Sequence, residues 1–398
     1  RGCDEIKRII PSVKSFFAGL DKLLIAISLI TSIFGAIMVH SATRYLLTDG
    51  MVISRDFRVM VIAIIAGIGM ALAISIIDYE WIGKLWPIIG IFCILLMIYT
   101  RIFGAAPDAR PDAKSWIEIG SFYFQSSELV KIGFIITFSM HIEFVKDKLN
   151  ELKSLITLGA HAALAAGLVL LCGDLGSAVV FVVIAVGMLF FAGLHWGYFA
   201  AGGLLGIAIS PLLWIYLFGD FHKNRFLALL HPELYPDEIY QQEKGINALG
   251  SGGFFGQGLF KGVYTQNGVV PEAVNDMIFS VVGEELGFFG CVFALLLLAA
   301  IIAKILKTGK NARDFSARLM CFGIAVMIVS QVIINIGMCL KLLPVIGITL
   351  PFFSAGGSST LCLYIGLGLV LSIYRYNRKQ KIVDFNLSNI HTPFAEYT

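Results

Sequence analysis

Ten apolar runs of about 20 residues divide this sequence from end to end and constrain its fold more than any other feature. They cover approximately residues 23–43, 59–77, 84–101, 128–145, 155–173, 175–192, 198–218, 281–303, 317–340 and 356–374. A helix needs about 20 apolar residues to cross the hydrocarbon core of a bilayer. Hydrophobic residues make up 58% of the chain and charged residues 14%, which excludes a fold surrounded by water. The sequence therefore predicts an all-α polytopic membrane protein with about ten transmembrane helices.

The distribution of lysine and arginine predicts how these helices are oriented. Ten crossings place both termini on one side, and 18 of the 30 basic residues fall on that side against 11 on the other. Because cytoplasmic loops are enriched in Lys and Arg, we predict that both termini are cytoplasmic. We expect one integral membrane domain over residues 1–398, with 1–22 and 375–398 as its cytoplasmic ends. No small-residue cleavage site follows the first run, so that run is expected to be retained.

Two predicted outer segments are too long to be simple connections. They are residues 102–127 and residues 219–280, the second of which lies between the seventh and eighth runs. Long loops of this kind are usually functional, so the chemistry is expected on the outer face of the membrane. A net charge of +3 is too small to indicate nucleic acid as a partner, and the histidines show no spacing typical of a zinc site.

Three acids, Asp276, Glu284 and Glu285, stand where the second long segment enters an apolar run. Acids at a membrane helix are costly, which favours a functional role. The alternative is that Asn275 or Asp276 only caps the helix, with the two glutamates favoured by its dipole. If the helix begins at Met277, Asp276 and Glu284 lie along one side and Glu285 points the other way.

The start of the fourth run combines Glu128 with Lys131, three residues apart. These side chains can pair on a helix, and Ser126 or Ser127 can cap it. A lysine one turn into a membrane helix costs up to about 3 kcal/mol unless it is paired or faces a polar cavity. It is therefore either a cation directed at an anionic headgroup or one half of a pair that extends to the interface.

Three further features each allow a simpler interpretation. Asp174, between the fifth and sixth runs, is either a turn residue or part of a polar cavity. Trp116 is either a functional residue or an interfacial anchor. The glycine run Gly250 to Gly258 lacks the spacing of a nucleotide-binding loop and favours a flexible re-entrant segment.

Taken together, these segments resemble the SEDS family of polytopic membrane proteins, whose members include RodA, FtsW and SpoVE. The resemblance extends from Met38 to Arg375. Its sharpest parts are Trp116-Ile117, Gln125 to Lys131, Gly250 to Gly253, Asn275 to Phe279, Gly283 to Gly287 and Leu342 to Ser354. Within the family we favour a RodA-like member that acts in cell elongation over one that acts in division or sporulation.

The resemblance implies a peptidoglycan glycosyltransferase that polymerises lipid II on the outer face of the bacterial cytoplasmic membrane and releases undecaprenyl pyrophosphate. The essential loop aspartate of the family falls on Asp276, which we expect to be the general base for the acceptor hydroxyl. For that role its carboxylate must be partly desolvated or coupled to Glu284. Other family positions, expected to contact substrate, fall on Trp116, Glu128, Lys131, Asp174, Glu284 and Glu285. We expect Arg55 and Arg225, with Lys131, to clamp the pyrophosphate.

The resemblance also implies a class B penicillin-binding protein as the crosslinking partner, besides lipid II and membrane lipids. No cofactor is required by the sequence. A divalent cation, Mg²⁺ or Mn²⁺, is implied by the family, but the sequence shows no protein-only metal site. Two alternative functions are a lipid II flippase and a non-catalytic scaffold for the penicillin-binding protein. A transporter should place its key charges near the membrane midplane, whereas the acids here gather in an outer loop and at helix ends, which favours the polymerase.

Overall fold

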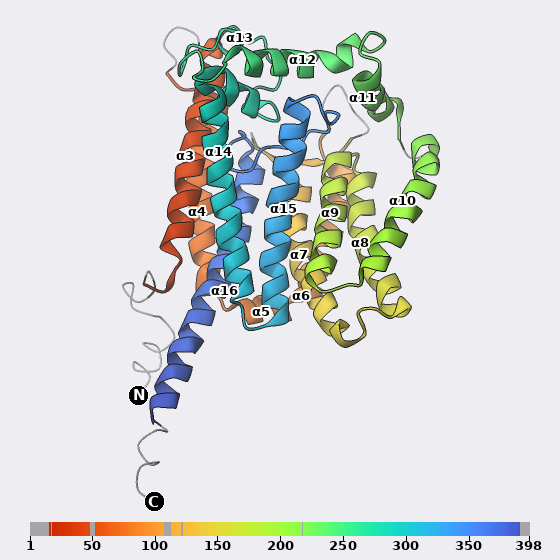
Figure 1. Cartoon of the computed structure of the whole chain (residues 1–398), viewed down its shortest axis with the longest axis vertical. Coiled ribbons are helices and arrows are strands. Elements are labelled where there is room, and N and C mark those ends of the chain that lie inside the picture. The colour runs from red at the N-terminus through yellow and green to blue at the C-terminus, as the bar shows by residue number, and fades with distance from the viewer. Residues whose placement is uncertain are drawn as a thin grey trace, which may run out of the picture.

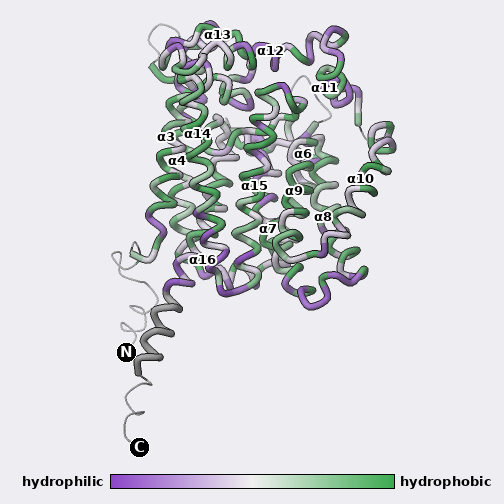
Figure 2. Tube along the Cα trace, viewed as in Figure 1, coloured by the Kyte–Doolittle hydropathy of each residue, from purple (hydrophilic) through white to green (hydrophobic). Residues whose placement is uncertain are grey.

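The computed structural model describes residues 16, 18–47, 52–106, 113–120, 122–216 and 218–390. Of the predicted cytoplasmic ends, residues 1–15, 17 and 391–398 lie outside these ranges. Long helices run side by side through the described part of the chain, and shorter helices cover one end of the bundle (Figure 1). Hydrophobic residues follow the length of the bundle and hydrophilic residues gather at its two ends (Figure 2), which is the pattern of a protein that spans a bilayer.

Each predicted run coincides with a helix, and among the described residues eight of these helices are long and apolar enough to cross a membrane. The helices are α3 (Lys22–Ala42), α4 (Arg55–Ile76), α6 (Trp86–Phe103), α7 (Ser126–Phe144), α8 (Leu152–Leu171), α9 (Leu175–Phe191), α10 (Trp196–Tyr216), α14 (Ile278–Lys310), α15 (Phe315–Cys339) and α16 (Gly357–Ile390). The other two helices fall outside this group for different reasons. Helix α9 is short, with 17 residues, and α7 carries three charged residues, Glu128, Lys131 and Glu143. The polytopic helical fold is confirmed, whereas the number of crossings and their orientation stay predictions.

Side-chain caps fix where several helices begin. The Ser54 hydroxyl accepts a hydrogen bond from the Phe57 amide over 3.2 Å at the start of α4. Asp174 accepts one from the Ser177 amide over 2.9 Å at the start of α9. Such caps satisfy backbone donors that have no partner within the helix. The closely spaced fifth and sixth runs are thus separated by a capping aspartate.

Burial falls from the middle of the bundle to its edge. In the apolar windows of α16 and α15, 78% and 67% of the residues are buried, whereas none of α10 is. Helix α7 packs against both and buries Phe134 and Phe138. The outer helices expose large apolar side chains such as Ile88 and Leu95 on α6. These surfaces are suited to contact with lipid chains rather than water.

Short elements connect the long helices and build the cap. The predicted connection 102–127 contains a two-stranded antiparallel hairpin, β1 (Trp116–Ile119) and β2 (Phe122–Gln125), which the all-helical prediction did not include. The predicted outer segment 219–280 holds α11 (Asp220–Leu230), α12 (Pro236–Ser251) and α13 (Val263–Gln266), which lie across the upper end of the bundle in Figure 1. The remaining short helices are η1 (Arg44–Leu46), α5 (Tyr79–Lys84) and η2 (Lys146–Lys148).

Candidate functional site

Asp276 lies just before α14, where the segment 219–280 meets the bundle. Only 6% of its surface is exposed, and Gln241 on α12 donates an Nε2 hydrogen to its Oδ1 over 3.2 Å. Met277 is the N-cap of α14, and no side chain caps that helix. The alternative interpretation of Asn275 or Asp276 as a simple cap is therefore wrong. The Asp276 carboxylate is instead held between α12 and the start of α14.

The backbone around Asp276 is fixed from two other parts of the chain. Asn335 on α15 donates its Nδ2 hydrogens to the carbonyl oxygens of Asp276 and Ile348, over 2.9 and 2.8 Å. The Ser354 hydroxyl donates to the carbonyl of Asn275 over 2.5 Å. Because these carbonyls are paired with side chains of α15 and of the segment before α16, contacts from outside its own loop help to fix the position of Asp276.

Desolvation makes Asp276 a stronger base than an ordinary aspartate. Burial, with a smaller contribution from the nearby Glu272 carboxylate, raises the pKa of Asp276 from 3.8 to about 7. Removal from water disfavours the charged form of a carboxyl group. Arg225 and Gln241 act in the opposite direction and lower this pKa. Of the two causes that the sequence left open, desolvation is the one that raises this pKa, and Glu284 is not among the described groups that shift it.

Arg225 reaches the surroundings of Asp276 from α11. Its guanidinium carbon lies 4.2 Å from the centroid of the Phe221 ring, and its Nη1 donates to the carbonyl oxygen of Val345 over 2.7 Å. These contacts hold the side chain on the inner side of the cap. Its charge is close enough to lower the pKa of Asp276, so the predicted base and one predicted clamp residue share one electrostatic environment.

Glu284 is completely buried and is surrounded by protein donors. Its Oε1 accepts a hydrogen bond from the Tyr264 amide over 2.6 Å. Its Oε2 accepts from both the amide and the hydroxyl of Thr265, over 2.9 and 2.5 Å. Hydrogen bonds to a charged acceptor are about twice as strong as neutral ones, so this carboxylate fixes α13 to the start of α14.

Glu285 is equally buried and holds the same loop from its other side. It accepts hydrogen bonds from the hydroxyl of Ser41 at 2.6 Å, from the amide of Phe260 at 3.1 Å and from Nε2 of Gln266 at 3.0 Å. Glu284 and Glu285 thus have different hydrogen-bond partners, as expected for side chains that point in different directions. Neighbouring helical residues differ by about 100° in direction, and the loop 260–266 curves far enough around α14 to meet both.

A break in α14 follows directly after this acidic pair. Gly287 has φ 67° and ψ −162°, a backbone conformation that is essentially restricted to glycine. The break frees two amides and two carbonyls from the helix, and the glycine-rich turn 252–258 pairs with all four. The hydrogen bonds run from Gln257 N to Glu284 O, from Gly258 N to Glu285 O, from Phe288 N to Gly253 O and from Phe289 N to Phe254 O, over 2.9, 2.9, 2.9 and 3.3 Å. The predicted re-entrant glycine run is thus a turn that joins to the interrupted helix.

Glu128 and Lys131 form the predicted ion pair at the start of α7. Lys131 Nζ lies 2.7 Å from Glu128 Oε1, and the two side chains are 0% and 7% exposed. A lysine that extended to the interface would expose its ammonium group. The complete burial of Lys131 therefore contradicts the snorkelling interpretation.

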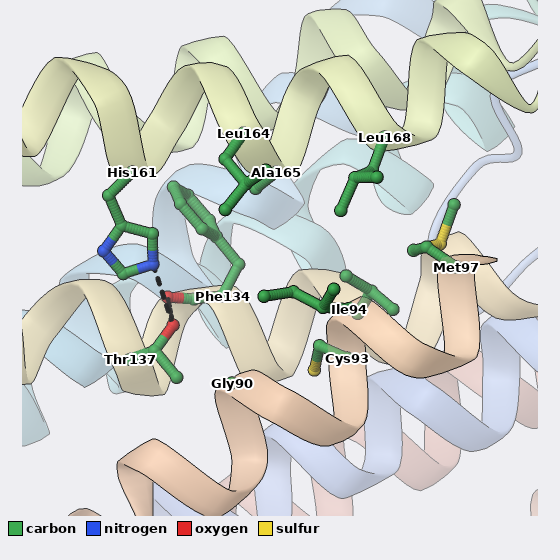
Figure 3. A pocket seen from close by; sticks show the side chains of 11 residues that line it. Gly90, Cys93, Ile94, Met97, Phe134, Thr137, His161, Leu164, Ala165 and Leu168 are labelled. Carbon is green, nitrogen blue, oxygen red and sulfur yellow. Dashed lines mark hydrogen bonds between the residues drawn. The ribbon is translucent and has the colours of Figure 1, made fainter.

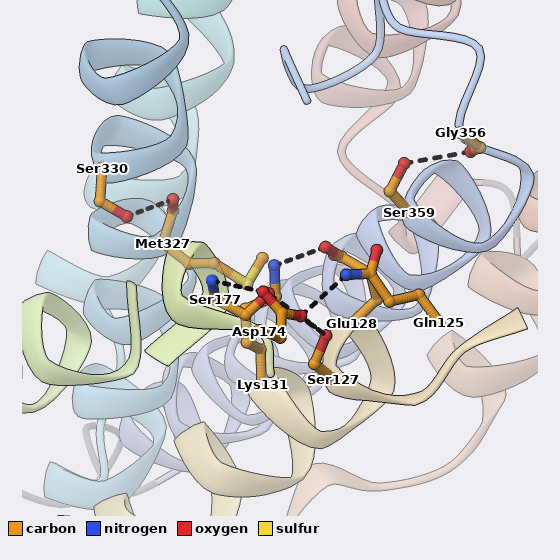
Figure 4. A network of polar contacts seen from close by, with 10 residues as sticks. All are labelled: Gln125, Ser127, Glu128, Lys131, Asp174, Ser177, Met327, Ser330, Gly356 and Ser359. Carbon is orange, nitrogen blue, oxygen red and sulfur yellow. Dashed lines mark hydrogen bonds and ion pairs between the residues drawn. The ribbon is translucent and has the colours of Figure 1, made fainter. Parts of the chain in front are cut away.

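Asp174 joins a polar network with the first residues of α7 (Figure 4). Its Oδ2 accepts hydrogen bonds from Gln125 Nε2 and from the Ser127 hydroxyl, both over 2.8 Å, while its Oδ1 caps α9. Asp174 is therefore more than a turn residue, because it both caps α9 and bonds to the start of α7. The predicted capping of α7 by Ser126 or Ser127 is wrong, because Gln125 is the N-cap and makes no side-chain capping bond.

Trp116 lies on the β-hairpin, and Arg55 lies at the start of α4. Trp116 is half-buried in β1, opposite Gln125 of β2, and its carbonyl accepts a hydrogen bond from the Ala105 amide over 2.7 Å. The hairpin thereby places Trp116 beside the Asp174 network. Arg55 is the first residue of α4, and its side chain is exposed.

Three polar residues that complete the site were not predicted: Gln241, Thr265 and Asn335. Asn335 carries a usable signal, since an amide inside an apolar run is costly unless it has a partner. Gln241 and Thr265 stand in polar stretches, where nothing in a single sequence separates them from their neighbours.

A separate cavity of about 60 Å³ lies between α6, α7 and α8 (Figure 3). Its lining is apolar apart from Thr137 and His161, whose Oγ1 and Nε2 are 3.3 Å apart. It contains none of the predicted site residues, so it is distinct from the site around Asp276.

Comparisons with known proteins agree with this architecture. The model of a family described as cell cycle protein, covering FtsW, RodA and SpoVE, matches residues 21–379. The chain is 31% identical over 368 residues to the probable peptidoglycan glycosyltransferase FtsW of Geobacter sp. (strain M18), covering 89% of this chain and 96% of that one. It is 29% identical over 373 residues to the peptidoglycan glycosyltransferase MrdB of Escherichia coli (strain K12), covering 92% and 97%.

The solved structures that resemble this one show the same fold. A chain of a peptidoglycan synthase complex, studied for the coordination of polymerization and crosslinking, superposes with a TM-score of 0.75 at 25% identity and covers 90% of this chain and 98% of its own. The Rod shape determining protein RodA of Thermus thermophilus superposes with a TM-score of 0.67 at 23% identity, covering 90% and 97%. With a family match over nearly the whole bundle, the chain belongs to the FtsW/RodA/SpoVE family of multi-pass membrane proteins, the SEDS family.

Proposed function

We propose that this chain is a peptidoglycan glycosyltransferase that polymerises lipid II. It transfers the lipid-linked disaccharide-peptide to a glycan strand and releases undecaprenyl pyrophosphate. The names of its relatives, probable peptidoglycan glycosyltransferase FtsW and peptidoglycan glycosyltransferase MrdB, support this activity. The observation that carries it here is the buried Asp276 carboxylate, whose pKa of about 7 suits proton transfer near neutral pH.

The chemistry assigned to Asp276 is that of a general base. As the acceptor hydroxyl oxygen bonds to the anomeric carbon, its proton passes to the Asp276 carboxylate. The bond between the anomeric carbon and the pyrophosphate oxygen breaks, and the electron pair leaves with the lipid pyrophosphate. A carboxylate with an ordinary pKa near 4 would be a much weaker acceptor for this proton.

Positive charge is needed where the pyrophosphate leaves. We assign this role to Arg225, Lys131 and Arg55, of which Arg225 lies in the electrostatic environment of Asp276. Trp116, Glu128 and Asp174 are also proposed to contact the substrate. Glu284 and Glu285 are proposed to act at the substrate site by holding the loop 260–266 in place.

The described residues alone do not form a binding site for a divalent cation. In the part of the chain that the structure describes, no group of three or more His, Cys, Asp and Glu side chains could hold a metal ion. The involvement of Mg²⁺ or Mn²⁺ stays a prediction.

The place of action and the partner complete the proposal. We place the reaction on the outer face of the bacterial cytoplasmic membrane, with both termini in the cytoplasm, in cell elongation. A class B penicillin-binding protein is the proposed partner. The similar chain from a synthase complex that coordinates polymerization and crosslinking supports such an assembly.

The test is polymerisation of labelled lipid II by the purified protein, with and without a class B penicillin-binding protein, followed by gel separation of the products. We expect a ladder of glycan strands from the wild type and none from Asp276→Ala. The matched control is Asp237→Ala, which removes an exposed carboxylate from α12 in the same cap and should leave the ladder unchanged. A ladder from Asp276→Ala would reject the base but keep the enzyme. No ladder from the wild type with the partner present would favour the flippase or the scaffold, which a vesicle translocation assay separates.

A further inference from the structure

A second polar cavity lies where α3, α14 and α16 meet, at the end of the bundle opposite to Asp276. Its volume is about 240 Å³, and its lining includes Asp21, Lys304, Lys307, Asn377 and Arg378. Lys304 lies about 39 Å from Ile278 along α14, at a rise of about 1.5 Å per residue. The cavity is therefore separate from the site proposed for polymerisation.

The charges that line this cavity do not balance. Asp21 pairs with Lys304, whose Nζ lies 2.7 Å from its Oδ2. Arg378 donates from Nη1 to the carbonyl oxygen of Ala18 over 3.0 Å, which orients the guanidinium group without neutralising it. Lys307 adds a third positive charge at the rim. Among the described residues of the lining, one carboxylate thus faces three cations, which gives these residues an excess of positive charge.

A buried amide in the same lining has an unused donor. Asn377 is 8% exposed, and its Oδ1 accepts a hydrogen bond from the Arg313 amide over 3.4 Å. Its Nδ2 makes no hydrogen bond to any described residue. Buried polar groups are seldom left without a partner, because desolvating them costs free energy. An acceptor inside the cavity would satisfy this donor.

From these observations we propose that the cavity binds a phosphate group, carried by an anionic lipid headgroup or free in solution. Arg378 and Lys307 supply charge-assisted donors, and Asn377 supplies a neutral one. Pockets that bind drug-sized molecules have volumes of about 300–1,000 Å³, so this cavity is smaller than they are. Its volume suits a phosphate group with a small substituent. The predicted topology places this end at the cytoplasmic leaflet, where anionic lipids are concentrated.

Native mass spectrometry of the detergent-solubilised full chain can test the proposal. The protein is titrated separately with phosphatidylglycerol, phosphatidylcholine and inorganic phosphate. The informative variants are Lys307→Gln, which removes one charge, and Asn377→Asp, which replaces the unused donor with an anion. The matched control is Lys310→Gln, in the same last turn of α14 but outside the cavity lining.

We expect the wild type to retain phosphatidylglycerol over phosphatidylcholine. Lys307→Gln should weaken that binding about fivefold, as removal of one basic residue near a membrane surface does, and Lys310→Gln should leave it unchanged. If inorganic phosphate displaces the lipid from the wild type but has no effect on Lys307→Gln, free phosphate is the source of the ligand. Equal effects of Lys307→Gln and Lys310→Gln, or equal retention of both lipids, would overturn the proposal. If Asn377→Asp does not fold, the comparison of the two lysine variants decides.

Discussion

Glu284 and Thr265 are joined by two hydrogen bonds to one carboxylate oxygen, from the Thr265 amide over 2.9 Å and from its hydroxyl over 2.5 Å. Both residues are buried, and a third bond from the Tyr264 amide completes the set. One side chain at the start of a membrane helix therefore holds α13 from one side. The acidic pair that follows the proposed base along the chain thus has a structural role in the cap, whatever contact it also makes with substrate.

Glu284→Ala should loosen the loop 260–266, because three donors lose their acceptor. An unsatisfied buried donor costs about 1–3 kcal/mol, so we expect a loss of several kcal/mol in local stability. Hydrogen exchange should show faster exchange of the Tyr264 and Thr265 amides in this variant. The matched control is Glu233→Ala, an exposed acid in the same outer segment, which should leave these amides as they are. Unchanged protection in Glu284→Ala would show that the carboxylate does not hold the loop.

Gly287→Ala should destabilise the protein more than a glycine substitution at an uncrowded position of the bundle. Gly287 has positive φ, and a Cβ atom there would lie 2.3 Å from the backbone nitrogen of Gly256. The backbone conformation alone costs about 1–3 kcal/mol for a residue other than glycine, and the clash adds to it. We expect a fall of several degrees in the unfolding temperature. Gly159→Ala on α8, where a Cβ atom meets nothing within 4 Å, is the control and should be neutral or slightly stabilising. Equal unfolding temperatures of the two variants would contradict this account of the break.

The helical bundle was predictable because its signals are local. Apolar runs give the helices, and a spacing of three residues gives the Glu128–Lys131 pair. The cap was not predictable in the same way. The contacts of Glu284 and Glu285 depend on how the loop 260–266 folds back over α14, and a single sequence does not encode that path in any periodic pattern. The β-hairpin at Trp116 was missed because its strands of four residues give little alternation to detect.

The activity should depend on pH through Asp276. With a pKa of about 7, only about a tenth of the Asp276 carboxyl groups are ionised at pH 6, so polymerisation should rise with pH and level off above neutrality. Arg225 lowers this pKa, so Arg225→Gln should shift the profile to higher pH. Initial rates of strand formation, measured from about pH 5.5 to about pH 9, provide the test. A rate that does not change below pH 7 would contradict the assignment of Asp276 as the base.

The raised pKa also predicts that the ionised Asp276 carboxylate lowers the free energy of unfolding. The folded pKa of Asp276, about 7, lies above its unfolded value of 3.8. The protonated Asp276 side chain therefore makes its full contribution to the free energy of unfolding below pH 3.8. This contribution is lost as the pH rises through 7 and the buried group ionises. Asp276→Asn removes the charge that is costly to bury, so this variant should be inactive yet up to about 4 kcal/mol more stable at pH 8. A lower unfolding temperature for Asp276→Asn at pH 8 would contradict the burial argument.

The Glu128–Lys131 pair allows its structural and functional roles to be separated. Lys131→Met alone leaves a buried carboxylate without its partner, which should cost about 3–5 kcal/mol. The double variant Glu128→Leu with Lys131→Met replaces the pair by apolar side chains of similar volume, and such replacements are often neutral or stabilising. We therefore expect the double variant to recover the unfolding temperature that the single variant loses.

Activity then distinguishes the two roles. If Lys131 binds the substrate pyrophosphate, the stable double variant should still fail to polymerise lipid II, because no cation remains at that position. If the pair serves only the packing of α7, activity should return together with stability. The first outcome is expected, because a fully buried ammonium group at the start of a membrane helix is costly to maintain for packing alone when apolar side chains can fill the same volume.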